Sequence, residues 1–153
     1  MFIRDRGILL WATGCGCGRS PVAPGTVGSL AALPFGWLLS HQSLGLALAI
    51  VVLFAIIAIG IAHRAAELMR REDPGAVVID EFAGVLVACV GLQLSFVGSL
   101  IVVGLFRGFD IAKPFPVGWL DRRLKGGVGI VADDLAAGLL ANLTYRAGLW
   151  LMT

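Results

Sequence analysis

Residues 21–62 read PVAPGTVGSLAALPFGWLLSHQSLGLALAIVVLFAIIAIGIA, and this stretch contains no Asp, Glu, Lys or Arg. About 20 helical residues cross the apolar core of a bilayer, so the stretch is long enough for two passes. The polar residues 40–43 divide it into two apolar parts. We therefore predict a helical hairpin, with one helix from near Thr26 to about Leu39 and a second over 44–69.

A second stretch without charged residues, 82–106, follows the turn signal Asp73-Pro74-Gly75. It is short for two full spans, and a polar interruption at 91–98 divides it, so we expect a re-entrant or half-buried helical pair. The β-branched run at 76–79 has no partner strand and is interpreted as the lead-in to the first of these helices.

The C-terminal third of the chain should begin with a loop. Two prolines, Pro114 and Pro116, remove backbone donors and end the helix that covers 100–109. We expect residues 113–130 to form a loop with one helical turn at 119–124. The final helix then begins at Asp133 or Asp134 and runs to about Leu151.

The composition of the whole chain also indicates a membrane protein. Of 153 residues, 58% are hydrophobic and 14% are charged, and the mean hydropathy is +0.92. This excludes disorder and collagen, and a net charge of +2 is too small for a nucleic-acid partner. We predict an all-α fold: a compact, multi-helix integral membrane bundle that forms a single domain over residues 1–153.

The charged residues gather in three segments, and Arg146 alone lies outside residues 1–20, 63–81 and 107–134. Lys and Arg in all three segments favour one cytoplasmic face, which requires the apolar stretches to be hairpins.

Several carboxylates stand where apolar sequence meets polar loop: Asp80, Glu81, Asp110, Asp133 and Asp134. Acids at helix ends can simply cap helices and face water. Beside long apolar runs, however, an ionised carboxylate is costly unless it is paired or binds metal. Several carboxylates on one face, without competing His or Cys ligands, suit a hard cation such as Mg²⁺.

Basic residues and glycines lie between these acids and provide the elements of a phosphate site. The candidate phosphate-binding residues among them are Arg107, Lys113, Gly126 and Gly127. Two more candidates, Arg19 and Thr26, belong to the N-terminal glycine-rich segment, and we expect Arg19 or the loop Gly14–Gly28 to close over the phosphate. Arg107 and Asp110, three residues apart, can also be a simple intrahelical ion pair. The chain has no Cys-x5-Arg, no Asp-x-Asp and no P-loop, so a metal-activated water is the simplest phosphoryl-transfer mechanism.

Four blocks of sequence, in order, resemble the phosphatidylglycerophosphatase A family. They are Thr13-Gly14-x-Gly16-x-Gly18-x-Ser20-Pro21-x-x-Pro24-Gly25-Thr26-x-Gly28-Ser29-Leu30, Ile79-Asp80-Glu81-Phe82-x-Gly84, Phe106-Arg107-x-Phe109-Asp110-Ile111-x-Lys113-Pro114-x-Pro116, and the group Asp121-Arg122, Gly126-Gly127-x-Gly129-Ile130 and Asp133-Asp134-x-x-Ala137-Gly138.

The resemblance implies an all-helical, Mg²⁺-dependent enzyme of the bacterial inner membrane. Its expected substrate is the lipid phosphatidylglycerophosphate, and its products are phosphatidylglycerol and inorganic phosphate. The acidic blocks imply that Asp80, Glu81, Asp110, Asp133 and Asp134 form the metal and catalytic centre. The alternative is a small membrane transporter or channel subunit with a carboxylate ion path, which would place acids inside the apolar stretches.

Overall fold

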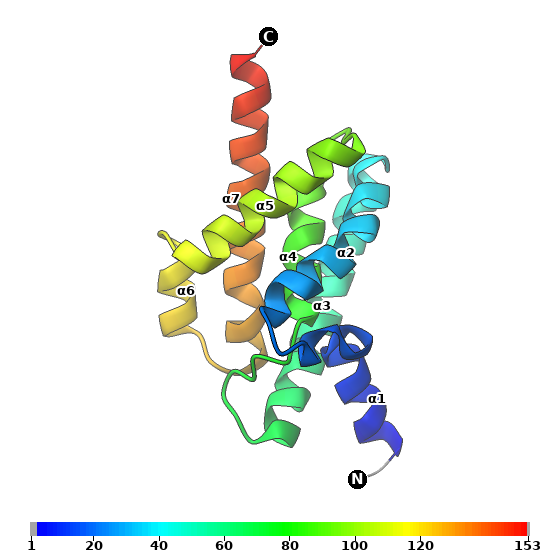
Figure 1. Ribbon diagram of the computed structural model, residues 1–153, viewed down its shortest axis with the longest axis vertical. Helices are drawn as coiled ribbons and strands as arrows, with labels where there is room; N and C mark the ends of the chain where they lie inside the picture. Colours follow the sequence, from blue (N-terminus) through cyan, green and yellow to red (C-terminus); the bar gives the residue numbers. More distant parts are fainter. Residues whose placement is uncertain (1–2, 153) are drawn as a thin grey trace.

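The computed structural model describes residues 3–152, and this part of the chain is helical with no strand, as predicted. In chain order the elements are α1 (Ile3–Ala12), the 3₁₀ segment η1 (Gly14–Arg19), α2 (Pro24–Ser40), α3 (Leu44–Met69), α4 (Ile79–Cys89), α5 (Phe96–Ala112), α6 (Val117–Arg123) and α7 (Gly126–Leu151). Figure 1 shows α4 in the middle of the bundle, beside α2, α3, α5 and α7.

Small residues let α4 and α7 pack with their backbones almost in contact. A Cβ added at Gly138 of α7 would collide with the carbonyl oxygen of Gly84 on α4. A Cβ at Gly84 would in turn meet the ring of Phe106, which is fully buried in the core. This close approach places α4, whose first turn carries Asp80 and Glu81, beside the N-terminal half of α7, which carries Asp133 and Asp134.

The far end of α4 is tied to α7 by side-chain hydrogen bonds. Asn142 Nδ2 donates to the carbonyl oxygens of Ala88 and Val90, each at 2.9 Å. Arg146 Nε donates to Asn142 Oδ1 at 2.8 Å, and its Nη2 donates to the carbonyl oxygens of Val90 and Gly91 at 3.0 Å. These bonds satisfy carbonyl groups that the end of a helix leaves without partners.

The predicted hairpin of residues 24–69 is present as α2 and α3. The turn between α2 and α3 lies at the same end of the bundle as the turn between α4 and α5, at the top of Figure 1. The charge-rich residues 3–20 and 63–81 lie in the lower half of that view and 107–134 at mid-height and below, whereas the last turns of α7 extend upward beyond the other helices.

Two helices of the described part, α3 and α7, are long and apolar enough to cross a membrane. Only 17% of the most apolar window of α3 is buried within the protein, against 56% for α7. The outward side chains of α3 include Leu46, Leu48, Val52, Leu53, Ile56 and Ile57. Most of α3 therefore presents apolar side chains to its surroundings.

The predicted start of the last helix is wrong, because α7 begins at Gly126 and not at Asp133 or Asp134. Residues 113–130 are accordingly not one loop, and α6 extends the expected turn to seven residues. Glycines are poor helix formers in isolation. Here, however, a side chain at Gly127 would collide with the Ile59 carbonyl of α3, so close packing against α3 favours glycine in this helical turn.

Other boundaries differ by a few residues. The first hairpin helix begins at Pro24, a residue favoured in the first turn because it has no N–H to leave unsatisfied. The helix expected from Leu100 begins at Phe96, where the Ser95 side chain accepts a hydrogen bond from Gly98 N. Residues 76–78 form a non-helical lead-in to α4.

Candidate active site

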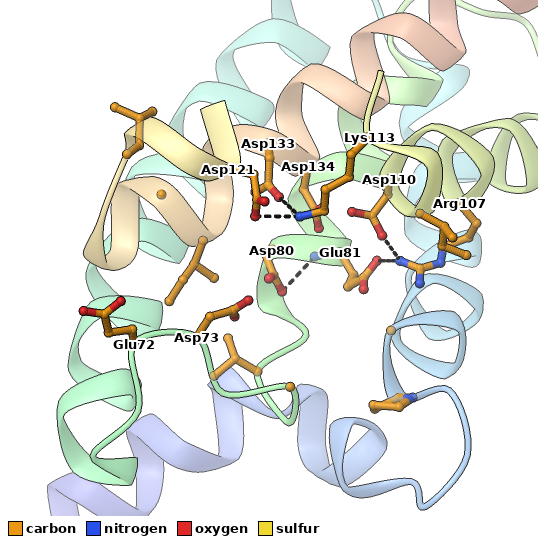
Figure 2. Close-up of a pocket in the computed structure, with 18 of the residues that line it drawn as sticks. Glu72, Asp73, Asp80, Glu81, Arg107, Asp110, Lys113, Asp121, Asp133 and Asp134 are labelled. Atoms are coloured by element: carbon orange, nitrogen blue, oxygen red, sulfur yellow. Dashed lines mark hydrogen bonds and ion pairs between the residues drawn. The ribbon is translucent and has the colours of Figure 1, made fainter. Parts of the chain in front are cut away.

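A pocket of about 480 Å³ opens where the first turns of α2, α4 and α7 meet the last turns of α5. Figure 2 shows acidic side chains pointing into it from several elements, with Lys113 and Arg107 among them. All five predicted catalytic acids are among the lining residues, which also include Gly25, Glu72, Asp73, Lys125 and Gly126. The pocket thus combines helix ends that are far apart in sequence.

Three of these acids can share one ion. Glu81, Asp110 and Asp134 each offer a carboxylate oxygen, and the three oxygens lie within 4.8 Å of one another. Asp134 is buried, and its Oδ2 has no hydrogen-bond partner within the described residues. A buried carboxylate oxygen without a partner is costly, so this donor set fits a hard cation such as Mg²⁺.

Arg107 holds two of the three carboxylates in place. Its Nη1 donates to Glu81 Oε2 at 2.5 Å and to Asp110 Oδ2 at 2.6 Å. The predicted intrahelical pair between Arg107 and Asp110 is therefore present, and the same guanidinium also reaches across to α4. The positive charge of the Arg107 guanidinium offsets negative charge in the cluster, and its hydrogen bonds fix the orientation of both acids.

Lys113 forms a second cationic contact in the pocket. Its Nζ donates to Asp121 Oδ1 of α6 at 2.6 Å and to Asp133 Oδ2 of α7 at 2.9 Å. Partial burial lowers the pKa of Lys113, but the hydrogen bonds and charges of the two carboxylates outweigh that effect and raise it. The ammonium group therefore stays charged at neutral pH and can also bind an anion.

The first turn of α4 supplies the two adjacent acids. Burial, followed by the negative charge of Glu81, raises the pKa of Asp80 well above its usual value. Burial also raises the pKa of Glu81, although the nearby Arg107 charge opposes this shift. Asp80 Oδ1 accepts a hydrogen bond from Glu81 N at 3.0 Å, which helps to hold the start of the helix. A cation in the pocket would favour the ionised form of both groups.

The predicted acids have different surroundings. Glu81, Asp110 and Asp134 converge, whereas Asp133 pairs with Lys113 and Asp80 bonds to the backbone beside it. All five still face the same cavity.

The predicted phosphate-binding residues are divided between the pocket and its surroundings. Arg107, Lys113 and Gly126 line the pocket, whereas Arg19, Thr26 and Gly127 are not among the lining residues. Arg19 is exposed at the end of η1. Gly127 N donates to His63 Nδ1 of α3 at 3.4 Å, so this amide is directed to another helix.

Sequence reasoning gave no individual site role to two residues at the start of α2. Gly25 packs directly against the ion pair, since a Cβ there would collide with Glu81 Oε1 and lie 2.9 Å from Arg107 Nη2. Ser29 is fully buried and donates to Glu81 Oε2 at 2.9 Å. The only sequence signal was their place in the block Pro24-Gly25-Thr26-x-Gly28-Ser29.

Comparisons with known proteins identify the family of this chain. The family model described as Phosphatidylglycerophosphatase A matches residues 10–149. Phosphatidylglycerophosphatase A of Escherichia coli (strain K12) is 38% identical over 143 residues, which cover 91% of this chain and 82% of the relative. Phosphatidylglycerophosphatase A of Haemophilus influenzae is 38% identical over 142 residues, covering 92% of this chain and 87% of that protein.

A third relative carries a different name. The putative phosphatidylinositol-3-phosphatase of Bacteroides thetaiotaomicron is 35% identical over 157 residues, covering 94% of each chain. No solved structure matches the chain significantly. Because the family match spans most of the sequence and includes every acid of the pocket, the chain belongs to the phosphatidylglycerophosphatase A family of phosphatase enzymes.

Proposed function

We propose that this protein hydrolyses the terminal phosphate monoester of phosphatidylglycerophosphate and releases phosphatidylglycerol and inorganic phosphate, a step of phospholipid biosynthesis. The convergence of Glu81, Asp110 and Asp134 beside Arg107 and Lys113 carries the proposal. It combines oxygen ligands for a metal with cations that bind a phosphate dianion. The names of two relatives supply the lipid substrate.

The proposed cofactor is Mg²⁺, held by Glu81, Asp110 and Asp134, with Asp80 and Asp133 lining the same cavity. Bound there, Mg²⁺ would polarise a phosphoryl oxygen and make a water molecule more acidic. Donor chemistry supports this choice, because the cluster offers only carboxylate oxygens and a buried Asp134 oxygen without a partner.

The protein's own groups would orient the phosphate. Lys113 Nζ already binds two carboxylates in the pocket and can donate to a phosphate oxygen with the same charge-assisted geometry. Arg107 keeps Glu81 and Asp110 fixed and contributes positive charge where the phosphate would enter. Fixed donors of this kind stabilise the charge that develops on a phosphoryl group during transfer.

We propose that the chain is a single, multi-pass domain of the bacterial inner membrane, with its pocket on the cytoplasmic side. The outward apolar face of α3 supports membrane embedding. The two hairpin turns lie at the end opposite the charge-rich segments (Figure 1), and every Lys and Arg except Arg146 lies in those segments. Such an asymmetry is typical of cytoplasmic ends. Membership of an enzyme family argues against the transporter alternative.

Phosphate release by the purified protein in detergent tests the proposal. Phosphatidylglycerophosphate, phosphatidic acid and phosphatidylinositol 3-phosphate would be compared, each with Mg²⁺ and with EDTA. The third lipid is included because one relative is named for it. We expect Mg²⁺-dependent release from phosphatidylglycerophosphate above the other two.

Two variants complete that experiment. Asp134→Asn should abolish release, because it removes the negative charge and one of the two oxygens of a buried carboxylate whose Oδ2 has no partner within the described residues. Glu67→Gln, at an exposed position of α3 outside the pocket, should leave release unchanged. Full activity of Asp134→Asn, or no release from phosphatidylglycerophosphate by the parent protein, would contradict the proposal.

A further inference from the structure

Ser29 lies on the second turn of α2 with its hydroxyl directed at a carboxylate of the neighbouring helix α4. Its side chain is fully buried, and Oγ lies 2.9 Å from Glu81 Oε2 and 2.8 Å from the Gly25 carbonyl oxygen. We propose that Ser29 is a positioning residue that orients Glu81 as a metal ligand. The inference rests on the proposed function, since it takes the carboxylate cluster to be the metal site.

A serine hydroxyl has one hydrogen, so it can fully serve only one of these two acceptors at a time. In an α-helix the carbonyl of residue 25 already receives the backbone N–H of residue 29. The carboxylate is the stronger acceptor because it is charged, and such hydrogen bonds are about twice as strong as neutral ones. The Ser29 hydrogen is therefore directed mainly to Glu81.

The donors on Glu81 are arranged asymmetrically. Ser29 Oγ and Arg107 Nη1 both donate to Oε2. Within residues 3–152, no hydrogen bond reaches Oε1, which lies over Gly25 where a larger residue would collide with it. With Oε2 held from two directions, the carboxylate plane is fixed and Oε1 is left available to a cation in the pocket.

A matched serine elsewhere in the fold separates positioning from ordinary helix packing. Ser99 of α5 is equally buried, and its Oγ donates to the Phe96 carbonyl oxygen of its own helix at 2.6 Å. Among residues 3–152 it has no carboxylate partner, and it does not line the pocket. Ser99→Ala therefore removes a buried hydroxyl without touching the cluster.

The experiment measures Mn²⁺ binding to the purified, detergent-solubilised protein by electron paramagnetic resonance, with Mn²⁺ as a spectroscopic probe of the Mg²⁺ site. Thermal unfolding in EDTA gives the stability of each variant without metal. Loss of a hydrogen bond to a metal-ligating side chain typically weakens metal affinity about 10–100-fold. We expect that increase in the Mn²⁺ dissociation constant for Ser29→Ala and an unchanged constant for Ser99→Ala.

The unfolding temperatures in EDTA should be similar for the two variants, because each loses one buried hydroxyl. Phosphate release by Ser29→Ala should recover as Mg²⁺ is raised, which gives a larger apparent Mg²⁺ constant with a smaller change in kcat. An unchanged Mn²⁺ constant in Ser29→Ala would overturn the inference and leave the proposed function intact. No Mn²⁺ binding by the parent protein would overturn both.

Discussion

Replacing Gly25 by alanine tests how tightly the start of α2 is fitted to the Glu81–Arg107 pair. The added Cβ would lie 2.9 Å from Arg107 Nη2 and closer still to Glu81 Oε1, whereas ordinary contacts begin at 3.4 Å. Arg107 Nη2 must therefore move by at least about 0.5 Å, and the carboxylate by more. Both groups border the proposed metal site, so the substitution displaces a ligand and its partner together.

A misplacement of about 1 Å at a reacting centre can lower turnover roughly 100-fold. We therefore expect kcat for phosphatidylglycerophosphate to fall about 30- to 100-fold in Gly25→Ala. Stability should change little, because alanine is the better helix former by about 1 kcal/mol and this offsets part of the local strain. Initial rates of phosphate release at saturating Mg²⁺, together with thermal unfolding, measure the two effects separately.

The control is Gly60→Ala on α3, where an added Cβ meets nothing within 4 Å. It makes the same chemical change in a helix and should leave turnover within about twofold of the parent protein. A Gly25→Ala variant that keeps more than half of the parent turnover would contradict this close fit. Equal loss of activity in Gly25→Ala and Gly60→Ala would also contradict it.

Three further predictions follow from other contacts. Removal of metal with EDTA should stop phosphate release, because the cluster of Glu81, Asp110 and Asp134 would lose its cation. Added Mg²⁺ should restore release, and release that persists in EDTA would contradict this prediction. Lys113→Met should raise KM for the lipid roughly 10- to 100-fold, because a charge-assisted hydrogen bond contributes about 1.5–3 kcal/mol. Steady-state kinetics measure KM, and an unchanged value would show that Lys113 does not bind the phosphate. Asn142→Leu should lower the free energy of unfolding by about 1–3 kcal/mol, because the carbonyl groups of Ala88 and Val90 lose a buried donor. Denaturation in detergent measures this change. An unfolding midpoint equal to that of the parent protein would argue against a stabilising role for the Asn142 hydrogen bonds at the end of α4.

The sequence predicted the hairpin of α2 and α3 because long charge-free runs and polar breaks are properties of local sequence. It missed the start of α7, where Gly126, Gly127 and Gly129 resemble a loop. Those glycines pack against α3 and the end of α6, with Leu124 O directly beside Gly129. Tertiary packing thus outweighs low helix propensity, and no local pattern reveals that contact.

Residue type was likewise a good guide to the pocket and a poor guide to its internal pairing. The five acids were predicted from their chemistry, and all five line one cavity. Their division into a converging trio and an Asp133–Lys113 pair was not predictable. It depends on which direction each side chain takes from helices that meet only in the folded protein.

By itself, the sequence determined the helical class, the charge-free hairpin, the gathering of acids beside basic residues, and the family resemblance. These follow from composition, spacing and residue chemistry along the chain. Only the tertiary structure decided which oxygens converge, that Arg107 joins two acids of the cluster, and that Gly25 and Ser29 contact Glu81. The physical reason is that these contacts act over a few ångströms between residues as many as 56 positions apart, so helix packing sets them.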